Sequence, residues 1–128
     1  MNVGDQIPEL KVTPDKYLPH RYAGASGDFN PIHIDVDFAK MVGLPSNILH
    51  GLYSMGLVAR ANATALADGD PRALKRLSVQ FRGMGLPEQE IVVSGTVKSV
   101  DDNRVVVDTV ATQGDNQIIR NAEAELEL

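Results

Sequence analysis

Apolar and polar residues alternate through most of the second half of the chain. Between Leu74 and Phe81, the side chains of Leu77, Val79 and Phe81 fall on one face, and the residues between them are polar. A period of two is typical of a β-strand with one face buried and the other exposed. We therefore expect a strand over Leu74–Phe81.

Three further strands are expected downstream, at Ile91–Val100, Arg104–Ala111 and Gln117–Leu128. Turn-forming residues separate them, with Asp-Asp-Asn at 101–103 and Gln-Gly-Asp-Asn at 113–116. Because these connections are short, the strands should form an antiparallel meander. The alternation leaves one face of this sheet polar.

The pattern of the first half is helical. Proline is tolerated in a helix only in the first turn, so a short helix is expected over Pro19–Ala25. A second helix should be capped by Asp35, run through Val42 and end at Gly43. The inner face of this second helix would consist of Phe38, Ala39 and Val42.

The longest predicted helix covers Gly51–Ala67 and has hardly any charge besides Arg60. A helix that is apolar on nearly every side is normally buried. The change from helical to strand pattern falls at residues 68–71, Asp-Gly-Asp-Pro. One buried helix against a long antiparallel sheet predicts an α+β layered fold.

Composition narrows the possible classes of protein. The chain has 128 residues, which favours a single domain over 1–128. Its net charge of −5 argues against nucleic acid as a partner, and the absence of cysteine excludes disulfides and thiol chemistry. No apolar run approaches the roughly 20 residues of a membrane helix, and the N-terminus lacks a signal-peptide pattern. We therefore expect a cytoplasmic protein without membrane contact.

One loop contains a candidate acid–base pair. Gly27, Asn30 and Pro31 are turn residues, so Asp28 and His33 should lie on a sharply folded loop between two helices. A carboxylate and an imidazole that face each other can hold a water molecule and transfer its proton. The alternative is an ordinary turn in which Asp28 only accepts a backbone hydrogen bond.

His50 and Gly51 mark the start of the long helix. The first N–H groups of a helix have no internal acceptor, and the helix dipole places partial positive charge there. Glycine allows a ligand close to that backbone, so a carbonyl oxygen gaining negative charge would be stabilised at Gly51. The alternative is that Gly51 only lets the chain turn into the helix.

The chain resembles a known enzyme family in these residues. The string Ala25-Ser26-Gly27-Asp28-Phe29-Asn30-Pro31-Ile32-His33, followed by Asp35, Ala39 and His50-Gly51, looks like the MaoC-like (R)-specific hydratase and dehydratase family. The resemblance also covers Val3-Gly4-Asp5 and the strand-rich half. It implies a hot-dog fold, in which an antiparallel sheet wraps around one long helix.

The resemblance implies the interconversion of trans-2-enoyl and (R)-3-hydroxyacyl thioesters of coenzyme A or acyl carrier protein. Asp28 and His33 would be the catalytic pair, and the backbone N–H of Gly51 would bind the thioester oxygen. Asn30 and Ser26 would have supporting roles. No metal or organic cofactor is expected. The active site would lie where two hot-dog subunits meet, in a homodimer or a heterodimer.

Two other functions stay open at this point. A hot-dog thioesterase would hydrolyse the same thioesters, and release of free thiol distinguishes it. A non-catalytic subunit would only complete the acyl tunnel of a partner, although such a subunit has no chemical need for Asp28 and His33. No motif in the sequence specifies the length of the acyl chain, the thioester carrier or the direction of the reaction.

Several polar residues have less defined roles. His50 either orients the start of the long helix or is purely structural, and His20 is expected at the surface. The alternation of His33, Asp35 and Asp37 is weak support for a metal site, because a helix cap explains Asp35. A basic group is either a solvated strand face or a docking surface for substrate phosphates; it consists of Arg72, Lys75, Arg76 and Arg82.

Overall fold

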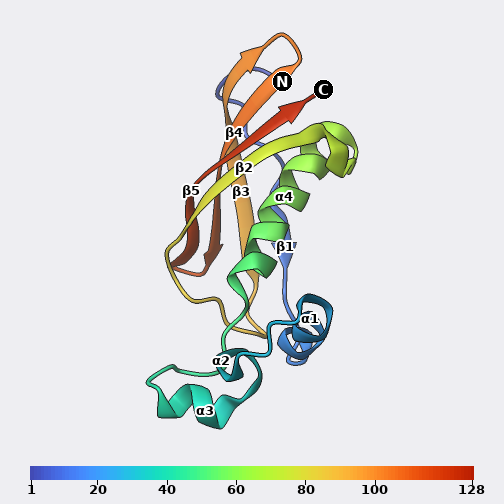
Figure 1. Cartoon of the computed structure of the whole chain (residues 1–128). Helices are drawn as coiled ribbons and strands as arrows, with labels where there is room; N and C mark the ends of the chain where they lie inside the picture. The colour runs from blue at the N-terminus through green and yellow to red at the C-terminus, as the bar shows by residue number, and fades with distance from the viewer.

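The computed structural model describes all residues, 1–128, as one antiparallel sheet with a long helix along one face (Figure 1). The sheet has five strands in the order β1-β3-β4-β5-β2, and every neighbouring pair is antiparallel. The strands are β1 (Leu10–Val12), β2 (Leu74–Phe81), β3 (Ile91–Asp101), β4 (Arg104–Gln113) and β5 (Asn116–Glu127). The α+β architecture expected from the pattern is confirmed.

The meander β3-β4-β5 forms because tight turns join strands rich in valine and isoleucine. Asp102 and Gly114, at the centres of the two turns, have φ angles of 53° and 55°. Asp and Gly tolerate this left-handed conformation better than most residues. β1 was not predicted, since three residues carry too little pattern to identify. β2 returns to the free side of β5, where one of its edges has no partner strand.

Helix α4 (Gly51–Ala67) has the predicted bounds and packs on the sheet with one face only. Its buried residues include Leu57, Val58 and Ala61. The expectation of a helix buried on nearly every side is wrong for the single chain, because Leu52 is 64% exposed and Arg60 faces solvent. One sheet covers one side of a helix, and the opposite side stays open.

The core lies between α4 and the inner face of the sheet, in two clusters of buried apolar residues. The larger one includes Leu57 and Val58 of α4 with Ile91, Val93 and Ile119 of the sheet. The smaller cluster lies toward the C-terminal end of α4 and has Val97, Val107 and Leu126 at its centre. These contacts bury the alternating positions of β3, β4 and β5.

Three short helices gather at the end of the sheet where α4 begins (Figure 1). They are α1 (Leu18–Ser26), α2 (Pro31–Ile34) and α3 (Val36–Met41). A 3-10 turn, η1 (Pro71–Ala73), precedes β2. The predicted first helix is confirmed, and Asp35 caps α3 by accepting from the Phe38 N–H at 3.1 Å.

Two details of this region differ from the prediction. Residues 31–34 form α2, although the sequence indicated a loop there; proline in the first position and a cap on Asn30 favour this single turn. α3 ends at Met41, so Val42 is its C-cap and is 53% exposed instead of facing inward; of the expected inner face, only Ala39 is fully buried. Among the helices, none has the length and apolar character needed to cross a membrane.

Candidate active site

The segment that leads to Asp28 is folded by a chain of local hydrogen bonds. Gly27 ends α1 with a φ of 78°, a conformation suited to glycine. The Ser26 hydroxyl oxygen accepts from the Asp28 N–H, and Asp28 Oδ1 accepts from the Asn30 N–H, both at 3.2 Å. Asn30 Oδ1 in turn accepts from the Ile32 N–H at 3.2 Å and caps α2. Asp28 Oδ1 is therefore hydrogen-bonded within the turn, and Oδ2 is left to interact with other groups.

His33 lies on α2 and is held from both its ring and its backbone. Its Nδ1 lies 2.8 Å from the Ile48 carbonyl oxygen. A carbonyl only accepts, so Nδ1 carries the proton and Nε2 is a bare acceptor in the neutral ring. Asn47 Nδ2 donates to the His33 carbonyl oxygen at 2.8 Å. The imidazole is thus fixed in one orientation and one tautomer.

Asp28 and His33 face each other across a short gap. His33 Nε2 and Asp28 Oδ2 lie 3.8 Å apart, with side-chain exposures of 10% and 52%. This distance is too long for a direct hydrogen bond, but one water molecule can hydrogen-bond to both atoms. The His33 side of the pair is therefore buried, and the Asp28 side is open to a ligand.

The N-terminus of α4 adjoins this pair. His50 is the N-cap residue, and no side chain caps the first turn of α4. The Gly51 N–H lies in that turn, where a helix has no acceptor of its own. A side chain at Gly51 would crowd Phe81 of β2, whose Cε1 lies 3.1 Å from the position of an added Cβ. Glycine at this position keeps a backbone donor accessible.

His50 connects the two parts of the site. Its ring stacks on that of His33, with centroids 3.9 Å apart and planes at 21°. Its Nε2 lies 3.0 Å from the Asp28 carbonyl oxygen, so this nitrogen is the donor. The Tyr22 ring also packs against the His50 ring, with centroids 4.7 Å apart. Sequence reasoning left His50 without a defined role, and its position before Gly51 was the only signal.

The structure therefore brings together Asp28, His33 and the start of α4 at Gly51, with Asn30 and Ser26 shaping the turn. Phe81 was not among the candidate residues, because its contact with Gly51 depends on the return of β2 to the sheet edge. The contacts of Asn47 and Ile48 with His33 were also not predicted, because every residue has a backbone carbonyl and the sequence does not indicate which one accepts a given hydrogen bond.

The group considered for metal binding differs from the one that the structure assembles. Asp35 serves as a helix cap, as expected. Asp28, His33 and His50 instead place possible ligand atoms within 4.8 Å of one another. Lone pairs of imidazoles lie in the ring planes, and these two rings are stacked, so their lone pairs do not converge on one point. The arrangement favours proton transfer over metal coordination.

The basic residues do not form one surface. Arg72 pairs with Asp70 at 3.0 Å on η1, before β2 begins. Arg82 follows the other end of β2. Because a strand of eight residues spans roughly 26 Å, Arg72 and Arg82 lie far apart. His20 is exposed as expected, and its Nε2 lies 3.0 Å from the Ile34 carbonyl oxygen.

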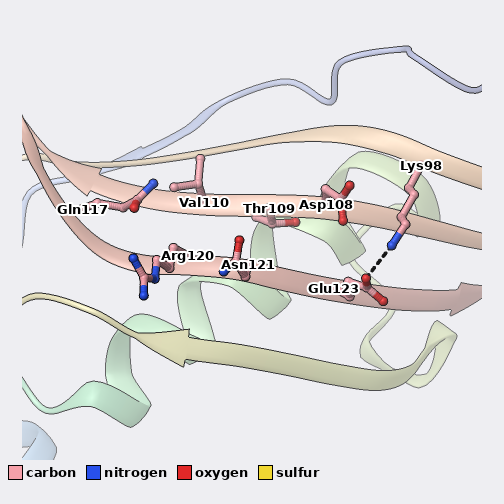
Figure 2. Close-up of a pocket in the computed structure, with 8 residues that line it drawn as sticks. All are labelled: Lys98, Asp108, Thr109, Val110, Gln117, Arg120, Asn121 and Glu123. Carbon is pink, nitrogen blue, oxygen red and sulfur yellow. Dashed lines mark hydrogen bonds and ion pairs between the residues drawn. The ribbon is translucent and has the colours of Figure 1, made fainter.

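A polar hollow of about 720 Å³ lies over β4 and β5, on the side away from α4 (Figure 2). Lys98 and Glu123 form an ion pair at one end of it, with Nζ and Oε2 2.6 Å apart, as the dashed line in Figure 2 shows. None of Asp28, His33 and Gly51 lines this hollow. The candidate site is therefore separate from the polar face of the sheet.

Comparisons with known proteins show which family and which solved structures this chain is similar to. A family model described as "MaoC like domain" matches residues 3–119. Enoyl-CoA hydratase ChsH3 of Mycobacterium tuberculosis is 33% identical over 90% of this chain and 40% of its own length. Peroxisomal enoyl-CoA hydratase 2 of Arabidopsis thaliana is 37% identical over 66% of this chain and 26% of its own length. The chain thus spans less than half of these two curated relatives.

Solved structures show the same fold. A MaoC-like dehydratase superposes with a TM-score of 0.93 at 30% identity, covering all of this chain and 41% of that one. The ChsH1–ChsH2 complex of Mycobacterium tuberculosis gives 0.88 at 26% identity, with 99% and 98% covered. R-hydratase PhaJ1 of Pseudomonas aeruginosa gives 0.87 at 25% identity, with 99% and 81% covered. The predicted hot-dog fold is confirmed.

Proposed function

Since this chain belongs to the MaoC-like domain family, we propose that it is a hydro-lyase that interconverts trans-2-enoyl and (R)-3-hydroxyacyl thioesters. We further propose that residues 1–128 act as a single domain. The names of the relatives, enoyl-CoA hydratase 2 and R-hydratase, support both the reaction and its stereochemistry. The thioester would be carried by coenzyme A or by an acyl carrier protein.

One observation supports the proposal most strongly: His33 Nε2 and Asp28 Oδ2 lie 3.8 Å apart beside the uncapped N-terminus of α4. Both atoms are proton acceptors when Asp28 is ionised and His33 is neutral. A water molecule between them would donate one hydrogen to each and direct its oxygen lone pair away from the pair. Its oxygen would then face a substrate bound against α4.

In the hydration direction, the water oxygen bonds to the β-carbon while the pair takes one proton from the water. The electrons of the double bond move toward the α-carbon and the thioester oxygen. The Gly51 N–H, together with the helix dipole, stabilises the negative charge on that oxygen. The proton held by the pair then bonds to the α-carbon on the same face. Dehydration is the same sequence in reverse.

The remaining site residues support this chemistry. Asn30 and Ser26 fix the turn, so that Asp28 presents Oδ2 to the gap. Positioned acid–base groups contribute roughly 10²–10⁴-fold each, and an oxyanion donor about 10²–10³-fold. No step needs a metal or an organic cofactor.

We propose that a second hot-dog subunit completes the site. β2 leaves one strand edge unpaired, and the open face of α4 exposes Leu52 beside it. Such an edge is a template for pairing with another chain. The structural relative titled as the ChsH1–ChsH2 complex supports a heterodimer as an alternative to a homodimer.

Light scattering on the purified chain tests this assembly. Leu52→Lys should convert a dimer to monomers, because a charge would be buried at the interface. Val100→Lys is the matched control, since Val100 is 41% exposed and lies at the far end of β3. A chain that is monomeric on its own, and dimeric only with a second subunit, would instead establish the heterodimer.

The proposed reaction is tested with crotonyl and longer enoyl thioesters of coenzyme A, using wild type, Asp28→Asn and His33→Ala. We expect both variants to lose about 10²–10⁴-fold in kcat. A parallel assay for free thiol tests hydrolysis. Thiol appearing faster than the hydroxyacyl product would establish a thioesterase, and equal turnover by all three proteins would disprove the site assignment.

We propose a cytoplasmic location for the protein. The relative from Arabidopsis thaliana is named as peroxisomal, which makes that compartment the alternative. Fractionation of cells that express the full-length chain, with markers for both compartments, distinguishes the two.

A further inference from the structure

We propose that His50 is a positioning residue: it holds the Asp28 backbone and the His33 ring so that their reactive atoms face each other beside α4. This inference rests on the proposed function, because the reactive atoms are those of the hydration mechanism. His50 itself does not face the gap between Asp28 and His33 as a proton acceptor, since its Nε2 is committed to the Asp28 carbonyl.

The contacts of His50 reach both members of the pair. The Nε2–H donates to the Asp28 carbonyl oxygen at 3.0 Å, which fixes the backbone two residues before the turn at Asn30. The ring stacks on His33 with centroids 3.9 Å apart. The hydrogen bond to Ile48 and the stack on His50 together fix the plane of the His33 ring, so that its Nε2 points toward Asp28.

His50 also sets the relation between the pair and the helix. It is the N-cap of α4, so its backbone is joined directly to Gly51. Asp28 is 22 residues away in the sequence, and no helix or strand contains both residues. The hydrogen bond and the stack are therefore direct links between the proton-transfer groups and the proposed oxyanion donor.

The choice of histidine is informative. The His50 Nδ1 atom is buried without a hydrogen-bond partner, which is unfavourable for a polar atom. A phenylalanine would avoid this cost and keep the stack, but it has no N–H for Asp28. A glutamine would keep a donor but not the flat ring. An imidazole supplies both the N–H and the flat ring.

Three substitutions separate the two contacts. His50→Ala removes both, His50→Phe keeps a ring, and His50→Gln keeps an amide donor at a similar reach. A shift of about 1 Å in catalytic groups can cost 10²-fold, so we expect His50→Ala to lower kcat about 10- to 100-fold. KM should change less than threefold, and His50→Gln and His50→Phe should each recover part of kcat.

His20 provides the matched control, because it is an exposed histidine whose side chain is hydrogen-bonded to the Ile34 carbonyl oxygen and not to Asp28 or His33. His20→Ala should keep kcat within twofold. If His50→Ala lowers only the melting temperature and leaves kcat unchanged, the residue is structural and the proposal is wrong. If His50→Ala does not fold, unchanged kcat in both His50→Phe and His50→Gln overturns the proposal in the same way.

Nitrogen-15 NMR of wild type tests the geometry without any substrate. We expect His50 with its proton on Nε2 and His33 with its proton on Nδ1. A proton on Nδ1 of His50 would overturn the proposal, because Nε2 would then donate nothing to Asp28. A wild-type protein with these tautomers but no hydratase activity would refute the proposed function alone.

Discussion

The Gly51 N–H is tested by removing it without removing the helix. Gly51 is the first residue of α4, a position that favours proline, and His50 has φ −65° and ψ 135°, as the residue before a proline prefers. Gly51→Pro therefore deletes one donor and is compatible with the local backbone. Loss of an oxyanion donor typically costs about 10²–10³-fold in kcat, or about 2.7–4 kcal/mol.

Gly51→Ala is the matched control for steric effects. Its Cβ would lie 3.1 Å from Phe81 Cε1, closer than ordinary contact, but the Phe81 side chain is 55% exposed and can move. We expect Gly51→Ala to lose only a few fold in kcat while Gly51→Pro loses about 10²–10³-fold more. Initial rates with crotonyl-coenzyme A and melting temperatures are measured for both. Equal kcat in the two folded variants would refute a role for this N–H.

Two further predictions concern stability. The hydrogen bond with Lys98 lowers the pKa of Glu123 below its ordinary 4.5. The stability that the ion pair contributes is therefore complete above pH 4.5 and is lost as the pH falls through the lowered pKa. Below pH 4.5, the urea midpoint of Lys98→Met should fall less steeply than that of wild type, and parallel curves would contradict this. Asn62 is fully buried, donates to Thr109 Oγ1 at 3.2 Å, and has an unpartnered Oδ1. Asn62→Ala should cost about 1–3 kcal/mol of unfolding free energy, whereas Asn62→Leu with Thr109→Val should be neutral or stabilising; a larger loss in the double variant would disprove this reasoning.

Periodic elements could be predicted from sequence alone because their signal is repeated over many residues. The bounds of α4 and the strands of the meander follow from such patterns, to within two residues for β4. Short elements such as β1 and α2 lack repetition, and their existence depends on tertiary neighbours. Exposure of Leu52 could not be predicted, since an apolar position does not specify what covers it.

The candidate site was predictable where one motif carries it and not where folding assembles it. Asp28 and His33 are close in sequence, so a turn suffices to bring them together. The stack of His50 on His33 and the approach of Phe81 to Gly51 join distant segments. Such contacts depend on the packing of α4 and β2, for which the sequence contains no local code.

The stereochemical course of hydration in D₂O tests the central claim most directly. A single acid–base pair on one side of the substrate must place hydroxyl and deuterium on the same face. We therefore predict one diastereomer of the 2-deuterated (R)-3-hydroxyacyl thioester, formed by syn addition and visible by proton NMR of the product. Anti addition, or a mixture of diastereomers at early times, would show that Asp28 and His33 do not act together on one water molecule.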